Sequence, residues 1–567
     1  MCGIIAGISA NGPSHSICHE ETEARVLEMA LSMDHRGPDE QGVHLGGSFW
    51  LGHTRLSIVS PEHGRQPLND REQKTFVVAN GEIYNHIKLR EELQLDNSVI
   101  QTQCDSEIII HGFNKIGAKI VDRLVGMFAF VLVSDDGKKV LVARDKVGIK
   151  PLYMGRSRDG QEVLFASELK SIVGQCAPED LVTFPAGYYW TPEEGMVKYY
   201  NPEWDADTFS ADMAVSQGYS GEEECRAALE AAVIARCMAD VPIGLLLSGG
   251  LDSSIIGAIM LQPNVRQHLT ATHGKIKTFA VGQEGSPDIV AARAVSKFLD
   301  TDHYEALFTP EDAFPVLEKI IYHMETYEPE LIRSSIPNYF LAKKAAEHVK
   351  VVLTGEGSDE IWSGYLYYAK CQEAAQLQEE NRRILNAVQF VNLQRCDRMS
   401  MSCSLEARVP FFDVHNIKTA MRLDPALKLC GEGADGRCEK HFLRKMYEKQ
   451  LPPEVVWRTK AMQCEGVGMT WVATLQRYIS ENLVTDEEFA GAAEAFPKNT
   501  PQSKEEYYYR SVFQKHFPGC DKFVHVWEGG CRAKGAAWDT AGLYTRAGLV
   551  DTEVLKKGFG LAEQITI

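Results

Sequence analysis

The sequence predicts two consecutive domains: an α+β domain of layered sheets and helices, then a doubly wound α/β domain with a helical C-terminal part. Three observations predict this fold class. The chain has 567 residues, whereas a single hydrophobic core stops growing at roughly 250–300 residues. Short β-branched runs dominate residues 1–205, and strand-like runs alternate with helix-like runs after residue 220. We therefore expect domains at 1–205 and 206–567.

The first domain shows apolar, β-branched runs separated by clusters of Gly, Asp and Asn, which is typical of strands joined by turns. The expected strands are 3–8, 49–59, 76–79, 127–133 and 139–143. The last two should form a hairpin across the Asp-Asp-Gly turn at 135–137. Helical periodicity near 20–33 and 106–115 then favours sheets covered by helices, not a regular βαβ series.

The second domain begins after a polar stretch without periodicity at 201–220. Ser220, followed three residues later by Glu223, is typical of a capping box and predicts a helix starting at about residue 221. Strands are expected at 241–247, 277–282, 304–308 and 350–354, with helices at 255–261 and 288–299. This alternation predicts a parallel sheet. Residues after about 365 should be mainly helical, and the last 50 partly irregular.

Composition excludes several classes of function. The formal net charge is 59 − 78 = −19, which argues against nonspecific binding to nucleic acid or to an anionic membrane. The 14 cysteines are scattered, without paired CxxC motifs at zinc-ligand spacing. No apolar run approaches the roughly 18 residues of a membrane span, and no basic leader precedes the first apolar run. We expect a cytoplasmic protein with reduced thiols and no nucleic-acid or membrane partner.

A glycine-rich segment, Leu-Leu-Ser-Gly-Gly-Leu-Asp-Ser-Ser at 246–254, lies between an expected strand and an expected helix. Backbone N–H groups and the helix dipole converge there on one point, which favours an anion such as phosphate. Asp252 beside a phosphate requires a cation between them, so it implies Mg²⁺. No Lys follows the glycines, so this is not a GxxxxGK[ST] loop. The alternative is an ordinary strand-to-helix turn.

A second segment, Thr-Gly-Glu-Gly-Ser-Asp-Glu at 354–360, follows the fourth expected strand. Ligands of a doubly wound sheet collect beyond the C-terminal ends of its strands, so this loop should face the first one. Asp359 then supplies a second carboxylate for Mg²⁺, and Glu356 is placed to act on an acceptor substrate. The alternative is an acidic turn whose carboxylates are solvated.

The chain begins Met1-Cys2-Gly3-Ile4. Removal of Met1 leaves Cys2 with a free α-amine, whose pKa near 8 suits it as a local base for the thiol. That arrangement supports attack on an amide. The alternative is a cysteine beside the start by chance.

Five segments together resemble the class II (N-terminal nucleophile) glutamine amidotransferases. They are MCGI at 1–4, HRGPD at 35–39, GHTRLSIV at 52–59, NGEIYN at 80–85 and DSE at 105–107. SGGLDSS resembles the pyrophosphate loop of the N-type ATP pyrophosphatases. With GEGSDE at 355–360, the whole set resembles glutamine-dependent asparagine synthetases of the bacterial B type over nearly the whole chain, thinning over the last 50 residues.

The resemblance implies an αββα Ntn-hydrolase glutaminase domain, with Cys2 as the nucleophile that forms a γ-glutamyl thioester. It implies an oxyanion hole from Asn80 and the backbone N–H of Gly81. Arg55 would hold the α-carboxylate of glutamine, because a planar bidentate donor fits a carboxylate. The remaining implied glutamine-binding residues are Leu56, Ser57, Ile58 and Val59 along the pocket, and Glu82 and Asp105 for the α-ammonium. His35 and His53 match the family and are interpreted as structural.

For the second domain the resemblance implies ATP as cosubstrate with Mg²⁺ held by Asp252 and Asp359. The implied ATP-binding residues are Leu247, Ser248, Gly249, Gly250, Asp252, Ser253, Val281, Thr354 and Gly355. Lys460 would act catalytically by neutralising phosphate charge. ATP would activate a carboxylate as an acyl-adenylate, and ammonia would reach it through a channel between the domains. A homodimer is compatible with the resemblance.

The expected acceptor pocket departs from the family. Asparagine synthetases usually carry a Thr-Thr pair two residues before the acceptor-site arginine, which here is Arg333; the pair is replaced by Glu330 and Leu331. The segment 461–466, which contains Glu465, also differs. The predicted pocket comprises Glu330, Leu331, Arg333, Glu356 and Glu465. A site that loses hydrogen-bonding hydroxyls rejects the substrate that needed them, so the acceptor is aspartate by default or another carboxylic acid as the alternative.

Three other readings fit the sequence less well. The β-lactam synthetases share the architecture but lack an N-terminal cysteine, so Cys2 counts against them. Other class II amidotransferases are coupled to phosphoribosyl or sugar-isomerase domains, which SGGLDSS excludes. A non-catalytic regulatory homologue would lose motif residues, and none of the principal ones is missing.

Overall fold

The computed structural model describes residues 2–70, 74–205, 220–431, 434–460, 467, 471–524, 556 and 559. Its first sheet has six antiparallel strands in the order β10-β8-β9-β1-β3-β2. These strands are β1 (Cys2–Ser9), β2 (Glu40–Leu45), β3 (Phe49–Arg55), β8 (Tyr153–Arg156), β9 (Glu162–Ala166) and β10 (Val182–Thr183). Cys2 pairs with Arg55 across β1 and β3, so two predicted site residues are neighbours on one sheet.

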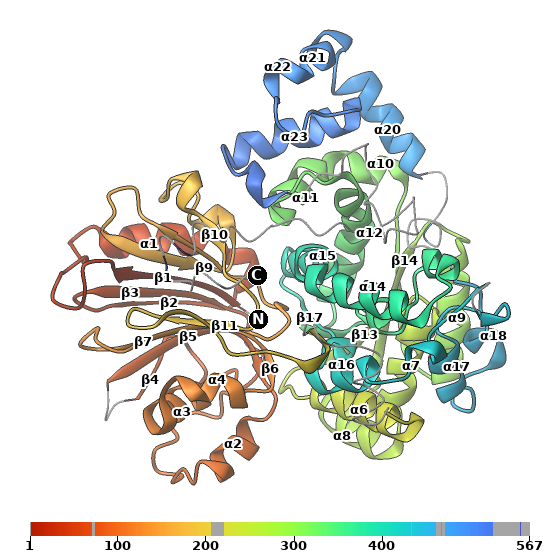
Figure 1. Ribbon diagram of the computed structural model, residues 1–567, viewed down its shortest axis with the longest axis horizontal. Helices are drawn as coiled ribbons and strands as arrows, with labels where there is room; N and C mark the ends of the chain where they lie inside the picture. Colours follow the sequence, from red (N-terminus) through yellow and green to blue (C-terminus); the bar gives the residue numbers. More distant parts are fainter. Residues whose placement is uncertain are drawn as a thin grey trace.

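The second sheet, in the order β12-β11-β7-β6-β5-β4, is stacked on the first. Its strands are β4 (Leu68–Asp70), β5 (Thr75–Ile83), β6 (Gly126–Ser134), β7 (Val140–Arg144), β11 (Tyr188–Thr191) and β12 (Gly195–Lys198). Helix α1 (Thr22–Leu31) covers the outer face of the first sheet. Helices α2 (His86–Glu92), α3 (Glu107–Ile116) and α4 (Ile120–Arg123) lie on the opposite side, against the second (Figure 1). The αββα prediction is confirmed.

Strand β1 shows why these runs are apolar on both faces. Ile4 and Ile8 join the core between the two sheets, together with Val131 of β6. Ile5 points the other way and packs in the cluster that contains Val26 of α1. Because side chains alternate along a strand, a sheet between a helix layer and a second sheet requires apolar residues at every position.

The predicted hairpin is confirmed, since β6 and β7 pair from Val133↔Val140. The predicted strand 49–59 is too long, because β3 ends at Arg55. Beyond it the backbone turns: the N–H of Ser57 donates to Asp39 Oδ2 at 2.7 Å, and the Arg55 guanidinium donates to the carbonyl of Ser60 at 2.8 Å. Residues 56–59 therefore form a loop under the site, not a continuing strand.

The second half contains a parallel five-stranded sheet in the order β15-β14-β13-β16-β17. Its strands are β13 (Ile243–Leu246), β14 (Lys277–Gly282), β15 (Asp302–Leu307), β16 (Val351–Leu353) and β17 (Glu406–Arg408). The chain runs outward from β13 to β15 and then returns to the other side of β13. The loops after β13 and β16 therefore meet at the switch point where such sheets bind ligands.

The helices around and beyond this sheet confirm the predicted doubly wound domain with a helical C-terminal part (Figure 1). They are α6 (Glu222–Ala235), α7 (Leu251–Met260), α8 (Pro263–His273), α9 (Pro287–Leu299), α10 (Pro310–Ala313), α11 (Leu317–Met324), α12 (Pro329–Ala346), α13 (Ser358–Ile361), α14 (Ala374–Ala387), α15 (Asn392–Met401), α16 (Val414–Met421), α17 (His441–Met446), α18 (Pro453–Val456), α20 (Trp471–Asn482), α21 (Asp486–Ala490), α22 (Ala492–Ala495) and α23 (Lys504–His516). Among the described residues, no helix is both long and apolar enough to cross a bilayer. Most of the last 50 residues lie outside the described ranges.

One local prediction is wrong, and one strand was missed. Gly221, not Ser220, is the N-cap of α6, and no side chain caps that helix. Ser220 lies one position earlier, held by its backbone N–H to the carbonyl of Arg422. Strand β17 was not predicted, because its sequence Glu-Ala-Arg has none of the apolar character of a buried strand; its charged residues are instead buried as a pair, Glu406 with Arg408.

Buried charges hold the two halves together. Arg398 of α15 contacts Glu168 of the first half at 2.8 Å and Glu325 at 2.9 Å, and all three side chains are almost fully buried. Lys170 bridges the same two carboxylates. Asp397, the next residue on α15, pairs with Arg36 at 2.9 Å. Because the Arg398 guanidinium binds one carboxylate from each half of the chain, it holds the two halves in a fixed relative position.

We expect Arg398→Met to lower the free energy of unfolding by about 3–5 kcal/mol, because it leaves two buried carboxylates short of a partner. The control Lys88→Met removes an exposed lysine that pairs with Glu92 on α2, and should cost less than about 0.5 kcal/mol. Thermal and urea unfolding measure both. Equal stability of the two variants would contradict a structural role for the buried network.

Candidate active sites

Cys2 lies at the start of β1 and is buried inside the first half. It is 6% exposed. Its backbone N–H donates to Asn80 Oδ1 at 3.1 Å, and its carbonyl accepts from Arg36 Nε at 3.0 Å. Burial raises the pKa of the Cys2 thiol, whereas the nearby Arg55 guanidinium acts to lower it. The thiol is therefore protonated at rest and needs a base in order to react.

The two predicted oxyanion-hole residues, Asn80 and Gly81, lie on β5 next to Cys2. Asn80 is fully buried on β5, and its Nδ2 has no hydrogen-bond partner among the described residues. Gly81 follows with φ 136°, and a Cβ there would lie 1.9 Å from the carbonyl oxygen of Met127, so only glycine fits. An unpaired buried amide is costly. This one belongs to the residue whose Oδ1 accepts from the Cys2 N–H, so its N–H is free to donate to a charged oxygen formed at Cys2.

Arg55 is buried on β3 behind the loop that follows this strand. Its Nη1 donates to Glu40 Oε2 at 2.6 Å and to the carbonyl of Pro61 at 2.9 Å. The same loop brings Leu56 and Ile58, both buried, under the site. Ser57 and Val59 complete the predicted lining, and Val59 is half-buried. The structure thus places the predicted cation and the predicted pocket wall in one segment.

Glu82 and Asp105 are both buried near Cys2. Glu82 Oε1 lies 3.3 Å from Arg408 Nη2 of the second half, and its Oε2 has no hydrogen-bond partner among the described residues. Burial raises the pKa of Glu82, and the neighbouring Glu406 and Asp105 raise it further. Asp105 accepts from the backbone N–H of Ile83 at 2.5 Å. Burial raises the pKa of Asp105 to about 6. A buried carboxylate oxygen lacking a donor suits an ammonium ligand.

The two histidines of the predicted motifs make structural contacts. His35 Nε2 lies 3.0 Å from Glu168. His53 Nε2 lies 3.2 Å from the carbonyl of Ala79, and burial lowers the pKa of His53 to about 3. These contacts agree with the interpretation of both as structural.

In the second half, the SGGLDSS loop joins β13 to α7 as predicted. Leu247 is buried and donates its N–H to the carbonyl of Phe279, while Ser248 is exposed at the loop tip. Gly249 has φ 71°, and a Cβ there would lie 2.4 Å from the backbone of Ala291 in α9. Gly250 has open space around its Cα apart from Ser248 Oγ. The loop is therefore packed on one side and accessible on the other.

The GEGSDE loop after β16 touches the first loop. A Cβ on Gly355 would lie 3.0 Å from the backbone nitrogen of Ser253, so glycine allows this approach. Ser358 Oγ donates to Asp252 Oδ1 at 2.7 Å. Thr354 and Val281 lie at the ends of β16 and β14 beside these loops. The prediction that the two loops face each other is confirmed.

A lysine that sequence reasoning missed lies between the two loops. Lys440 Nζ is 2.7 Å from Asp252 Oδ2 and 2.6 Å from Asp359 Oδ1, and its side chain is almost fully buried. Lys460 Nζ is 2.5 Å from Asp359. Burial acts to raise the pKa of Asp359, but these two ammonium groups hold it well below its usual range. Lys440 precedes α17 with φ 55°, and no sequence motif marks it.

The two aspartates fit Mg²⁺ as a donor set. Their carboxylates converge on one cation, the ammonium of Lys440, which shows that both are aimed at a common point. No group of three or more potential metal-ligating side chains is present in the part of the chain that the structure describes. Mg²⁺ is typically held by one or two carboxylates, with substrate phosphates supplying further oxygens, which is what this pair provides.

The predicted acceptor residues that the structure describes lie on the second loop and on α12. Glu356 pairs with Arg395 of α15, which also donates to Ser334 Oγ on α12 at 3.3 Å. Arg333 forms a two-pronged contact with the buried Glu505 of α23, with Nε donating at 2.8 Å. Leu331 is buried in the first turns of α12, and Glu330 is exposed. Glu465 lies outside the described residues. Arg395 and Glu505 were missed, because nothing in their sequence context distinguishes them.

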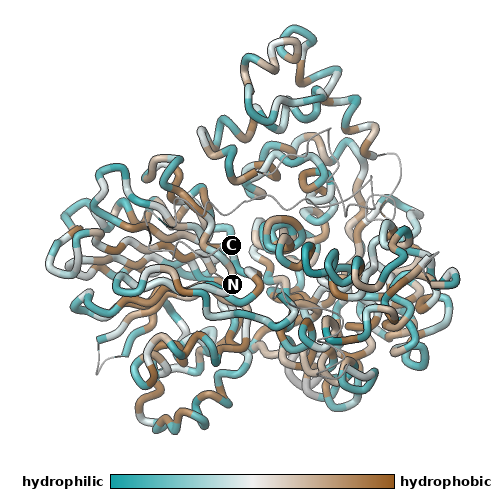
Figure 2. Tube along the Cα trace, viewed as in Figure 1, coloured by the Kyte–Doolittle hydropathy of each residue, from teal (hydrophilic) through white to brown (hydrophobic). Residues whose placement is uncertain are grey.

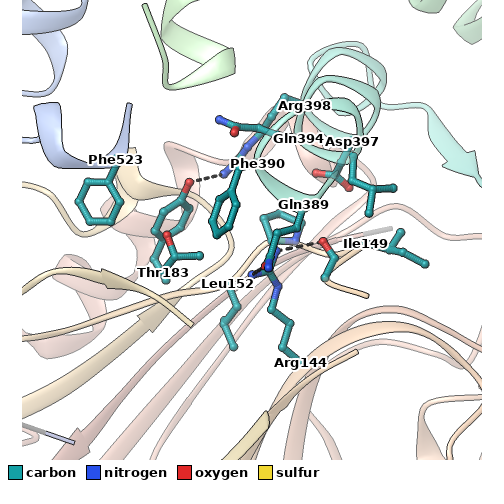
Figure 3. Close-up of a pocket in the computed structure, with 14 residues that line it drawn as sticks. Arg144, Ile149, Leu152, Thr183, Gln389, Phe390, Gln394, Asp397, Arg398 and Phe523 are labelled. Carbon is teal, nitrogen blue, oxygen red and sulfur yellow. Dashed lines mark hydrogen bonds between the residues drawn. The ribbon is translucent and has the colours of Figure 1, made fainter. Parts of the chain in front are cut away.

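A pocket lies where the two halves meet. It is lined by Arg144, Leu152 and Thr183 from the first half, and by Gln389, Asp397 and Phe523 from the second, among others (Figure 3). Arg144 Nη1 donates to Gln389 Oε1 at 3.0 Å across it. The wall residue Asp397 is also the partner of Arg36, which holds Cys2. The interdomain channel itself stays a prediction.

Comparisons with known proteins match each half of the chain to a family. The model of the glutamine amidotransferase domain matches residues 1–186, and that of asparagine synthase matches residues 224–387 and 369–540. Asparagine synthetase B [glutamine-hydrolyzing] of Escherichia coli K12 is 42% identical over 88% of this chain and 89% of its own length. The chain belongs to the asparagine synthase family. Another family member, asparagine synthetase [glutamine-hydrolyzing] 2 of rice, is 38% identical over 95% of this chain and 90% of its own length.

Proposed function

We propose that this enzyme is a glutamine-hydrolysing asparagine synthetase, a carbon–nitrogen ligase that converts aspartate, ATP and glutamine into asparagine, AMP, pyrophosphate and glutamate. One observation carries the proposal: an orphan buried amide beside the Cys2 thiol occurs in the same chain as two touching glycine-rich loops with converging aspartates. The first arrangement suits amide hydrolysis and the second suits nucleotide chemistry.

In the glutaminase half, removal of Met1 frees the α-amine of Cys2 to accept the thiol proton. The thiolate attacks the side-chain amide of glutamine, and Asn80 Nδ2 with the Gly81 N–H stabilises the developing oxyanion. Ammonia leaves, and water then hydrolyses the γ-glutamyl thioester. Arg55 binds the α-carboxylate of glutamine, and Glu82 with Asp105 binds its α-ammonium.

In the synthetase half, the backbone of Ser248, Gly249 and Gly250 holds the pyrophosphate portion of ATP at the start of α7. Leu247, Val281, Thr354 and Gly355 contact the nucleoside. Asp252 and Asp359 would hold Mg²⁺, which supplies charge neutralisation for the phosphates. Lys440 and Lys460 place two further positive charges beside them. Glu356 orients the acceptor, held in turn by Arg395.

The acceptor is the least constrained part of the proposal. Glu330 and Leu331 offer a carboxylate and an apolar group, and Arg333 is engaged by Glu505, which supports another carboxylic acid as the alternative to aspartate. A panel of carboxylic acids with ATP, Mg²⁺ and ammonium chloride, scored by pyrophosphate release, distinguishes them. A kcat/KM for aspartate at least tenfold above every other acid supports asparagine synthesis. A different preferred acid identifies the alternative.

The Asp105 carboxyl makes glutamine binding pH-dependent. Below its pKa of about 6 the carboxyl is protonated and neutral, so it loses its attraction for the ammonium of glutamine. We expect glutaminase kcat/KM to reach its plateau above the pKa near 8 of the Cys2 α-amine, to fall about tenfold per pH unit below it, and to show a further step near pH 6, below which the fall steepens to about a hundredfold per pH unit. Asp105→Asn should lower the plateau and remove the step, whereas Asp135→Asn, at an exposed turn, should change neither. A step that persists unchanged in Asp105→Asn assigns it to another group.

We further infer a cytoplasmic homodimer with a domain boundary at 205/206. The two family models support the boundary, since they leave 187–223 between them. Limited proteolysis should cut within the polar, non-periodic stretch 201–220 and release fragments of the two predicted sizes, and light scattering gives the oligomeric state. Cleavage elsewhere first, or a monomer, would contradict these inferences.

A further inference from the structure

A short antiparallel turn carries two cysteines into register beside the nucleotide loops. Gly431 and Arg437 form a β-bridge, with the Gly431 N–H donating to the Arg437 carbonyl at 2.8 Å. One position beyond that pair on each strand are Cys430 and Cys438. The bridge is isolated. Positions that flank a hydrogen-bonded pair form the next, non-hydrogen-bonded pair, whose Cα atoms lie about 4.5 Å apart where antiparallel pairing extends. That separation is within the range that a disulfide requires.

The two thiols differ in access. Cys438 is half-buried, whereas Cys430 is 2% exposed and lies in the cluster that contains Cys371. Burial, followed by the neighbouring Glu439, Cys371 and Cys438 side chains, raises the pKa of Cys430 to about 12. The contribution of the Cys438 thiol requires it to lie near Cys430, in agreement with this placement. An oxidant in solution therefore meets Cys438 first, with Cys430 behind it.

The pair is connected directly to the phosphate-binding charges. Cys438 lies two residues before Lys440, whose Nζ contacts both Asp252 and Asp359. Glu439, between them, holds Arg444 through its carboxylate and its carbonyl. Lys440 is itself in the left-handed region, with φ 55°. A displacement of Cys438 moves Lys440, because only Glu439 separates them and its two contacts with Arg444 leave the segment little freedom to absorb the displacement.

We propose that Cys438 and Cys430 form a thiol-modification site at which oxidised glutathione, or a similar small disulfide, closes a reversible bond that slows the ATP-dependent half-reaction. The Cys438 thiolate attacks glutathione disulfide and releases one glutathione thiolate. The Cys430 thiolate then attacks Cys438 Sγ of the mixed disulfide and releases the second. Two protein thiols are oxidised and one glutathione disulfide is reduced to two glutathiones, so atoms and electrons balance.

The effect on rate rests on the proposed synthetase function, but the bond itself does not. A Cα separation of about 4.5 Å is at the short end of the disulfide range, whose most common value is about 5.5–6 Å. Closing the bond therefore pushes the two strands apart, moves the 438–440 segment and shifts the Lys440 ammonium from its place between the aspartates. Misplacement by about 1 Å at such a site costs up to about 100-fold in rate. Cys2 and the glutaminase residues lie on the other half, so glutamine hydrolysis should not change.

The full-length protein is incubated with oxidised glutathione and then divided. Peptide mapping by mass spectrometry under non-reducing conditions should give a 430–438 disulfide. Pyrophosphate release with aspartate, ATP, Mg²⁺ and ammonium chloride should fall at least tenfold and recover with dithiothreitol, while glutamine hydrolysis stays within twofold. Cys438→Ser should resist the loss, and Cys430→Ala should stop at the mixed disulfide. Cys18→Ser, a half-buried cysteine in the first half, should behave as the parent.

A disulfide that maps to Cys371, absence of any protein disulfide, or formation of the 430–438 bond without loss of pyrophosphate release overturns the proposal. Failure of the proposed function is distinguishable, because it appears as absent pyrophosphate release in the reduced protein before any oxidant is added.

Discussion

Cys2→Ala is expected to reduce glutamine hydrolysis by about 10⁴-fold or more, because the nucleophile and the proton it transfers are both lost. Asparagine formation with ammonium chloride should remain, since ATP and acceptor bind in the other half. Glutamate release from glutamine and pyrophosphate release with ammonium chloride measure the two activities separately. Loss of the first alone assigns nitrogen supply to Cys2.

The matched control is Cys18→Ala, in the same half. Cys18 Sγ donates to the carbonyl of Phe49 at 3.1 Å. Phe49 pairs with Ile8, at the end of the β1–β3 ladder opposite to the Cys2–Arg55 pair. This variant should keep both activities. Glutamine hydrolysis that survives Cys2→Ala would show that another nucleophile acts. Loss of both activities in Cys2→Ala, together with a lowered melting temperature, would show that the Cys2 side chain is required for folding. Arg36 contacts the backbone carbonyl of Cys2, so the substitution itself leaves that contact in place.

Sequence periodicity predicted the strands whose residues are apolar for packing reasons. β1 and β6 are buried on both faces and read as continuous apolar runs, and β13 reads likewise as the central strand of a parallel sheet. β17 escaped prediction because Glu406 and Arg408 satisfy each other by an ion pair, an arrangement that only three-dimensional pairing reveals. The capping box failed because Ser220 is held by Arg422, about 200 residues away in sequence.

The candidate sites divide in the same way. Asn80 and Gly81 were expected from the family resemblance, which rests on short motifs of neighbouring residues, and their role stays a prediction. Lys440 and Arg395 could not be predicted, because each acts on a residue from a distant segment: Lys440 on Asp252 and Arg395 on Glu356. A lone lysine or arginine in a sequence is most often a solvated surface cation. Only burial and contact distinguish these two.

Lys440→Met is expected to lower pyrophosphate release by about 10²-fold or more, because a fixed positive charge beside the developing pyrophosphate is removed. The same change should lower the Mg²⁺ concentration needed for half-maximal rate. The ammonium now lies between Asp252 and Asp359 and repels a metal ion bound by the same carboxylates. Pyrophosphate release measured against Mg²⁺ concentration gives both quantities.

The two opposite shifts separate a direct electrostatic role from a general loss of structure. A misfolded site would lose rate and bind Mg²⁺ more weakly, whereas removal of a competing cation loses rate and binds Mg²⁺ more tightly. Lys445→Met, on the same helix α17 but half-exposed beside Glu448, should change neither quantity. If Lys440→Met requires more Mg²⁺ than the parent, the ammonium does not compete with the metal. That result would contradict a Mg²⁺ position between Asp252 and Asp359 that overlaps the Lys440 ammonium.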